Sequence, residues 1–453
     1  MRLTGIAIIA VLLVAPALGC RCPSGCCVPA TPNVPCVLGT TAPEGTPPDL
    51  VRLVPDCQLE ECDLAPLPEP GEVLYRVTAA DVQCRAAANA AVPNMIELEE
   101  HWASVIIECD SKYVQRNMCL LRDLLDLRAA DLRNKAAESA LETFYRLGAL
   151  EARRHYLDMA IEETSQSLAR ADSLRDANLP APEDHDEISV QLAQLEDERL
   201  QLQYARLVLN GQLQKLIGCP VSEQSFLWPE VDWTPDLAAP DAGAELADGL
   251  PRRYDLRAIG LMWCNLERST LRVARGVLNV ADGAVGSVEP TSGWIHRLRC
   301  IMCSDIEVDI RCRQLQLFYD DTEQLATGEI KAAVSRVVLQ QQRVAAARLA
   351  VDARRAHLYE LTAKRDADDV PVFELTRARG RLFTAEAELV QQVADLKIAQ
   401  ATLKRCRGLL GEECGFAPCL CRENCCCGAC TRCQAPTCRP GQLPCRCEKC
   451  CRH

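Results

Sequence analysis

The chain has 453 residues, of which 48% are hydrophobic but only 4% aromatic, and its formal net charge is −13. The length allows two or three ordinary domains. The scarcity of aromatic residues favours close helix packing over bulky globular cores. Nucleic-acid binding needs a basic footprint, and this acidic chain lacks one, so we expect no nucleic-acid partner.

The first 19 residues have the features of an export signal. Arg2 supplies a positive charge, an apolar core runs over 6–14, and small residues precede Cys20. The apolar core is too short to span a bilayer. A cysteine directly after Ala-Leu-Gly resembles a bacterial lipoprotein box, in which Cys20 becomes the acylated first residue. The alternative is an ordinary signal peptide with Cys20 in a disulfide.

Cysteines are concentrated in two flanking segments. The chain has 29 of them, which in an exported protein indicates an oxidising compartment. Residues 20–72 are rich in cysteine and proline, and we predict a lipid-tethered linker there. Residues 413–453 form a separate cysteine-rich tail.

Some tail cysteines have the spacing of metal ligands, and thiolates at that spacing suit zinc or copper(I). Dense cysteines in an exported segment usually form disulfides instead. Disulfides, metal binding and free redox thiols therefore stay open, and we predict no resident metal. The candidate ligands are Cys427, Cys430, Cys433, Cys447 and Cys450.

Between these flanks a long helical pattern occurs twice. The first set of apolar residues, each seven apart, is Ile188, Leu195, Leu202, Leu209 and Leu216; the second is Leu375, Leu382, Leu389, Leu396, Leu403 and Leu410. A strict period of seven gives a narrow apolar seam and a supercoiled helix. The recurrence predicts a mainly α fold, built as a tandem duplication of one long antiparallel helical hairpin.

The first repeat is predicted over 73–222. A short helix opens near Thr78, and a long helix follows over about 115–176. The returning helix stops at Gly218, with Pro220 beyond it, as helices normally stop.

A proline-rich connector is predicted over 223–252, and the second repeat over 253–412. Its rising helix carries valine and leucine in heptad spacing at Val337, Val344, Val351 and Leu358.

One stretch breaks the helical pattern. From 306 to 313, apolar residues alternate with the charged residues Glu307, Asp309, Arg311 and Arg313. Strict alternation predicts a strand with one apolar and one charged face. The strand is either part of a small membrane β-barrel, with the charged residues facing its lumen, or one arm of a half-buried soluble hairpin.

Three short segments resemble the outer membrane efflux protein family, the TolC-like exit ducts. Residues 253–258, Arg-Tyr-Asp-Leu-Arg-Ala, are similar to the opening of that family's second repeat, with tyrosine in place of proline. Residues 382–389 resemble the helix after the second tip, and 213–218 resemble a repeat ending. The resemblance covers about 73 to 412.

The resemblance implies a homotrimeric α-barrel of long helical hairpins, with short β-hairpin insertions forming a small membrane β-barrel. It implies an exit duct for an efflux or type I secretion system, lipid-anchored at the outer membrane and extending into the periplasm. Its partners would be a periplasmic adaptor protein, an inner-membrane pump and outer-membrane lipid. We find no catalytic constellation and no phosphate-binding loop, so we expect no enzyme and no cofactor.

The resemblance also implies a gate at the hairpin tips. Glu374 stands where the family places an acidic gate residue, and Asp366, Asp368 and Asp369 add charge at the turn. A ring of like charges in a narrow pore binds cations and repels anions. The alternative is that these acidic turn residues are simply solvated.

A rival interpretation is a periplasmic coiled-coil scaffold or adaptor lipoprotein without a pore. It includes a protein that binds metal through its cysteine-rich tail and uses the helices as a stalk.

Overall fold

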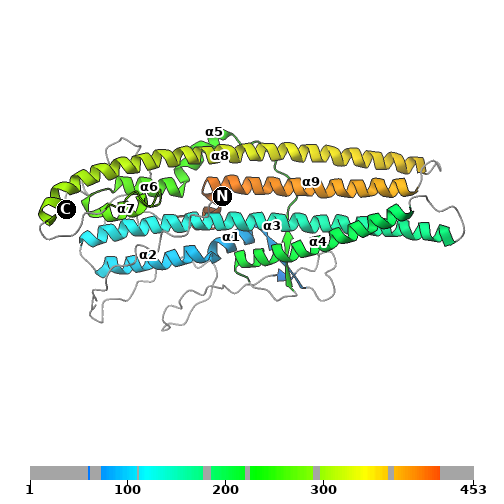
Figure 1. Ribbon diagram of the computed structural model, residues 1–453, viewed down its shortest axis with the longest axis horizontal. Coiled ribbons are helices and arrows are strands. Elements are labelled where there is room, and N and C mark those ends of the chain that lie inside the picture. The colour runs from blue at the N-terminus through cyan, green and yellow to red at the C-terminus, as the bar shows by residue number, and fades with distance from the viewer. Residues whose placement is uncertain are drawn as a thin grey trace.

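The computed structural model describes residues 60–61, 73–109, 112–176, 185–219, 225–288, 296–365 and 372–418. Its long helices are α3 (Lys112–Asp176), α4 (His185–Ile217), α8 (His296–Arg365) and α9 (Val372–Cys406). Figure 1 shows them running along an elongated molecule. Because α8 packs on α9, α9 on α3 and α3 on α4, they form one layer in the order α8, α9, α3, α4.

The first repeat begins with strand β2 (Val73–Thr78), followed by α1 (Ala79–Asn89) and α2 (Ala91–Cys109). Thr78 is the N-cap of α1, and its hydroxyl and the Asp81 carboxylate form a capping box. The short helix expected near Thr78 is therefore confirmed. The α2 helix packs along α3 and lies beyond α1 on the side away from α4 (Figure 1).

The second repeat repeats this arrangement with more short helices. They are α6 (Tyr254–Cys264), the 3-10 turn η2 (Arg268–Thr270), α7 (Leu271–Leu278) and, after α9, α10 (Leu409–Glu413); α5 (Ala242–Arg252) precedes them in the predicted connector. Helices α6 and α7 pack against α8. They extend the α9 row toward the end of the molecule opposite the hairpin tips, as α2 extends the α4 row (Figure 1).

A small sheet joins the start of the first repeat to the connector. Strand β3 (Ser225–Glu230) pairs parallel with β2, and β1 (Glu60–Glu61) pairs antiparallel with β2 on its other side. These strands lie near the middle of the molecule (Figure 1), which we call the equator. The sequence interpretation missed β2 and β3; the only local signal was a short run of aromatic and branched apolar residues in each.

The heptad seams pack as predicted. Leu202 packs with Leu150 and Leu157 between α4 and α3. Val337 and Val344 pack with Leu396 and Leu403 between α8 and α9. Each hairpin therefore closes on its own apolar seam.

Both returning helices end at glycines in the left-handed conformation, Gly218 (φ 68°) and Gly408 (φ 78°). A side chain at such a φ is strained, so glycine sets the end of the helix. The stop predicted at Gly218 is confirmed. The second helix breaks at Gly408, and Leu410 belongs to the separate helix α10.

The strand predicted over 306–313 is wrong, because these residues lie inside helix α8. The same eight residues also place Glu307 and Arg311 one helical turn apart. A pattern this short therefore does not distinguish a strand from a helix. Tertiary contact decided the outcome: Glu307 accepts from Arg275 of α7 and from Arg311 one turn along α8, whereas Ile306 and Ile310 face solvent. Within the described ranges, no helix is long and apolar enough to cross a bilayer.

Candidate functional site

The second hairpin is tied to the first near the tips by polar contacts from α9. The Arg377 guanidinium donates to Glu187 of α4 at 2.8 Å, and Arg379 donates to Glu163 of α3 at 2.6 Å. The first pair is well exposed, with the Arg377 and Glu187 side chains 40% and 60% accessible, and the second is partly buried. They join the hairpins without fully burying a charge.

The candidate gate residues lie at the same end. Glu374 is exposed in the first turn of α9, where the helix dipole favours an acidic side chain. Asp366, Asp368 and Asp369 lie outside the described residues. One helical turn after Glu374 stands Arg377. A basic residue fits this position because it pairs with Glu187 of α4.

His185 closes the tip of the first hairpin. Its Nε2 lies 2.9 Å from an Asp172 carboxylate oxygen, and its Nδ1 lies 3.3 Å from Asp186. The hydrogen bond with Asp172, and then that with Asp186, raises the pKa of His185 above its usual value of 6.5. The first residue of α4 is thereby linked to α3 in a manner that depends on pH.

A groove of about 970 Å³ lies between α4 and α9 over α3. Its lining includes both signs of charge, for example Arg153 and Arg381 with Glu198 and Glu388, together with the Phe383 ring. Arg153 donates to Glu198 across the groove at 2.5 Å. The groove therefore has a mixed, solvated surface.

The two outermost helices of the layer carry apolar rows on the faces away from their seams. On α4 the row is Leu200, Tyr204 and Leu207; on α8 it is Leu325, Leu339 and Leu349. The spacings of three, four, ten and fourteen residues keep each row on one helical face. These side chains are between 48% and 71% accessible. We call the two rows the α4 edge row and the α8 edge row.

Of the four charged residues of the predicted lumen strand, the structure pairs Glu307 with Arg311 at 3.3 Å and leaves the other two apart from them. Glu307 pairs with Arg275 at 2.8 Å, and this contact lowers the pKa of Glu307. Arg311 is buried and also reaches the Val288 carbonyl at 3.0 Å, whereas Asp309 and Arg313 are exposed.

Cys20 and the five candidate metal-ligating cysteines of the tail lie outside the described residues.

The equator holds a dense set of contacts that sequence reasoning missed. Asn134 of α3 donates to the Arg405 carbonyl and accepts from the Leu410 amide. The Tyr254 hydroxyl donates to the Gly408 carbonyl at 2.7 Å; burial raises the pKa of this tyrosine above its usual range. Only the resemblance of residues 253–258 to a repeat opening drew attention to this region.

Buried charge also marks the equator. Arg206 of α4 donates to Glu151 of α3 at 2.6 Å, and both side chains are almost inaccessible. The guanidinium stacks on the Phe226 ring of β3, 4.3 Å from its centroid. The ion pair thus joins the first hairpin to the sheet.

No family model matches the sequence, and no curated protein matches it. Solved structures do match. One is a structure of CusC, from work on the conformational changes that accompany folding and transmembrane channel formation. It aligns over 81% of this chain and 98% of the CusC chain, with a TM-score of 0.52 and 11% sequence identity. The open MtrE outer membrane channel of Neisseria gonorrhoeae aligns over 73% and 88% (TM-score 0.47, 12% identity). The outer-membrane channel OprN aligns over 65% and 72% (TM-score 0.49, 17% identity).

The likeness to CusC extends over nearly all of that chain and over four fifths of this one. It confirms the mainly helical, tandem-hairpin architecture expected from the heptads. The chain therefore has the fold of the TolC-like outer-membrane channels.

Proposed function

We propose that the chain is the outer-membrane exit duct of a tripartite efflux or type I secretion system and works as a homotrimer. One observation carries the proposal: the α4 and α8 edge rows lie on opposite borders of a single helical layer. The fold shared with CusC, whose structures concern transmembrane channel formation, supports it.

The edge rows give a physical reason for assembly. An exposed apolar row, such as that containing Tyr204, usually marks an interaction site. The two rows are different surfaces, so joining the α4 edge of one copy to the α8 edge of the next is a heterologous contact, which forms a ring if the rotation closes. A ring of such layers encloses a lumen. The number of copies, three, follows from the resemblance to the efflux family.

The rest of the machine follows from the same proposal. The hairpin tips meet a periplasmic adaptor protein, and an inner-membrane pump supplies the energy, since a duct carries out no chemical step. Acylated Cys20 anchors the chain in outer-membrane lipid. Small molecules or exported polypeptides pass through the lumen.

The assembly is tested on detergent-purified protein by light scattering and negative-stain electron microscopy. We expect a hollow threefold tube. Tyr204→Glu and Leu349→Glu each place a charge in an edge row and should yield folded monomers. Met159→Glu is the matched control: Met159 is exposed on the central helix α3, and the variant should still assemble. A solid rod, or a monomer or dimer for the unaltered chain, would leave the poreless scaffold as the better interpretation.

We further propose that Glu374, with Asp366, Asp368 and Asp369, lines the resting constriction at the tips. The Arg377–Glu187 ion pair would then hold the second hairpin on the first in the closed state. Replacing Arg377 by glutamate puts two carboxylates in contact, so we expect the tips to separate and conductance in planar bilayers to rise several-fold. Arg153→Glu, which breaks a pair inside the first hairpin, should leave conductance unchanged. Equal conductance in both variants would refute the gate.

A further inference from the structure

Helix α10 lies where the second repeat returns to the first. It has five residues and starts directly after the left-handed Gly408. So short a helix is not stable by itself in water. Leu410 is fully buried against Ala87 of α1 and against Ala137 and Leu141 of α3. The position of α10 must therefore be fixed by its contacts with α1 and α3.

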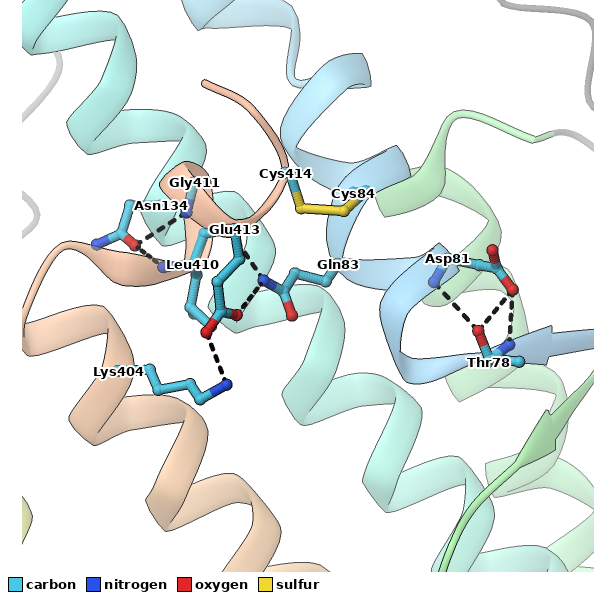
Figure 2. Close-up of a disulfide and its surroundings, with 10 residues drawn as sticks. All are labelled: Thr78, Asp81, Gln83, Cys84, Asn134, Lys404, Leu410, Gly411, Glu413 and Cys414. Atoms are coloured by element: carbon cyan, nitrogen blue, oxygen red, sulfur yellow. Dashed lines mark hydrogen bonds and ion pairs between the residues drawn. A yellow bond between two sulfur atoms is a disulfide. The ribbon is translucent and has the colours of Figure 1, made fainter. Parts of the chain in front are cut away.

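Polar side chains hold both sides of α10 (Figure 2). The Gln83 amide donates to the Leu410 carbonyl and to Glu413, both at 2.9 Å. The Asn134 oxygen accepts from the backbone amide of Leu410 at 3.0 Å. Lys404 donates to Glu413 at 2.8 Å.

The residues after Gln83 and after Glu413 are joined by a disulfide. Cys84 and Cys414 lie 330 residues apart in sequence, with their Cα atoms 5.1 Å apart. The bond connects α1 of the first repeat to the end of the second (Figure 2). Both cysteines are only partly buried, so a redox partner can reach them.

The chain beyond the disulfide is held as well. The Phe416 ring lies under the Arg133 guanidinium, 4.4 Å from it, and Arg133 also pairs with Glu97 of α2 at 2.6 Å. The disulfide thus joins Cys414 to α1, and Arg133 joins Phe416 to α3 and α2.

We propose that the Cys84–Cys414 disulfide is an oxidation-dependent clamp, which seats α10 on α1 and completes the equator only after the chain reaches an oxidising compartment. The bond forms by thiol–disulfide exchange with a disulfide-bearing oxidant. The two thiols lose two protons and two electrons, and the oxidant leaves as two thiols. Gln83 and Asn134 position the segment, and the covalent bond holds it there. The clamp does not depend on the duct function.

The test is hydrogen–deuterium exchange, read by mass spectrometry, on the full chain with Cys84→Ser and Cys414→Ser combined. Exchange follows local opening, so we expect peptides covering 409–416 to exchange roughly tenfold faster or more. Peptides from the α8–α9 seam should not change. Cys312→Ser removes a free thiol on α8 and serves as the control.

A second arm uses the unaltered, folded protein, in case the double variant does not fold. Mild reductant should speed exchange over 409–416, and removal of the reductant should restore it. Unchanged exchange over 409–416 after verified reduction would overturn the clamp. So would non-reducing peptide maps in which Cys84 and Cys414 pair with other cysteines.

Discussion

The two hairpins are joined in different ways at the equator and at the tips. At the equator the contacts are buried or covalent, as with the Asn134 hydrogen bonds to Arg405 and Leu410 and the Cys84–Cys414 bond. At the tips they are mainly exposed ion pairs such as Arg377–Glu187, beside one long buried contact of 3.4 Å between the hydroxyls of Ser167 and Thr376. An exposed ion pair contributes about 0–1 kcal/mol, whereas a buried polar group left without its partner costs ~1–3 kcal/mol. The same two hairpins are thus fixed at their middle and weakly held at their tips.

The difference indicates where the molecule can move at low cost. Separating the tips breaks solvated ion pairs, which water largely replaces. Separating the two repeats at the equator would expose Leu410 and leave several buried hydrogen-bonding groups without partners. We therefore expect any rearrangement of the two hairpins to begin at the tips and to leave the equator intact.

The largest effect is expected at Arg206. Arg206→Ala would remove the closest partner of the buried Glu151 carboxylate, which keeps a longer contact with Arg154 at 3.9 Å, so the free energy of unfolding should fall by about 3 kcal/mol. Arg153→Ala removes an exposed pair between the same two helices and should cost about 0–1 kcal/mol. Denaturant unfolding of both variants measures the contrast. Similar losses would show that burial does not separate the two classes of contact.

A smaller effect is expected at the glycine that ends α4. A Cβ at Gly218 would lie 2.8 Å from Asn89, at a φ of +68°, so Gly218→Ala should destabilise the protein by roughly 1–3 kcal/mol. Gly211 lies in the same helix with no atom near its Cβ position. Gly211→Ala should therefore stabilise by about 1 kcal/mol through helix propensity. Thermal unfolding of the two variants should show shifts of opposite sign.

The smallest effect is expected from His185 at the tip. Its pKa is raised in the folded protein because Asp172 and Asp186 favour the protonated ring. The stabilisation is therefore fully present below the ordinary pKa of 6.5 and is lost as pH rises through the higher folded pKa. The protection of amides in the first turn of α4, taken relative to their intrinsic exchange rate at each pH, should therefore fall over that interval. His185→Gln should remove this pH dependence of the protection. An NMR titration of the His185 ring with a midpoint at or below 6.5 would contradict the raised pKa.

Much of the fold could be read from the sequence because its signals are local and repeated. Heptad spacing from Ile188 to Leu216 and from Leu375 to Leu403 determined the long helices and their buried seams. The stop at Gly218 and the cap at Thr78 followed from backbone chemistry within a few residues. These features require no knowledge of where the rest of the chain lies.

Tertiary structure alone decided the contacts between distant segments. The pairing of β2 with β3, the Cys84–Cys414 bond and the Arg377–Glu187 contact each join residues separated by about 150 or more positions. No local pattern encodes such a pairing, because 29 cysteines and 113 charged residues (50 basic, 63 acidic) offer many alternatives. The alternation at 306–313 failed for a related reason: eight residues fit strand and helix equally. Only in the helix does Glu307 meet both Arg275 of α7 and Arg311 one turn further along α8. The sequence thus determined the two hairpins, and their packing against each other determined the equator, the tips and the edges.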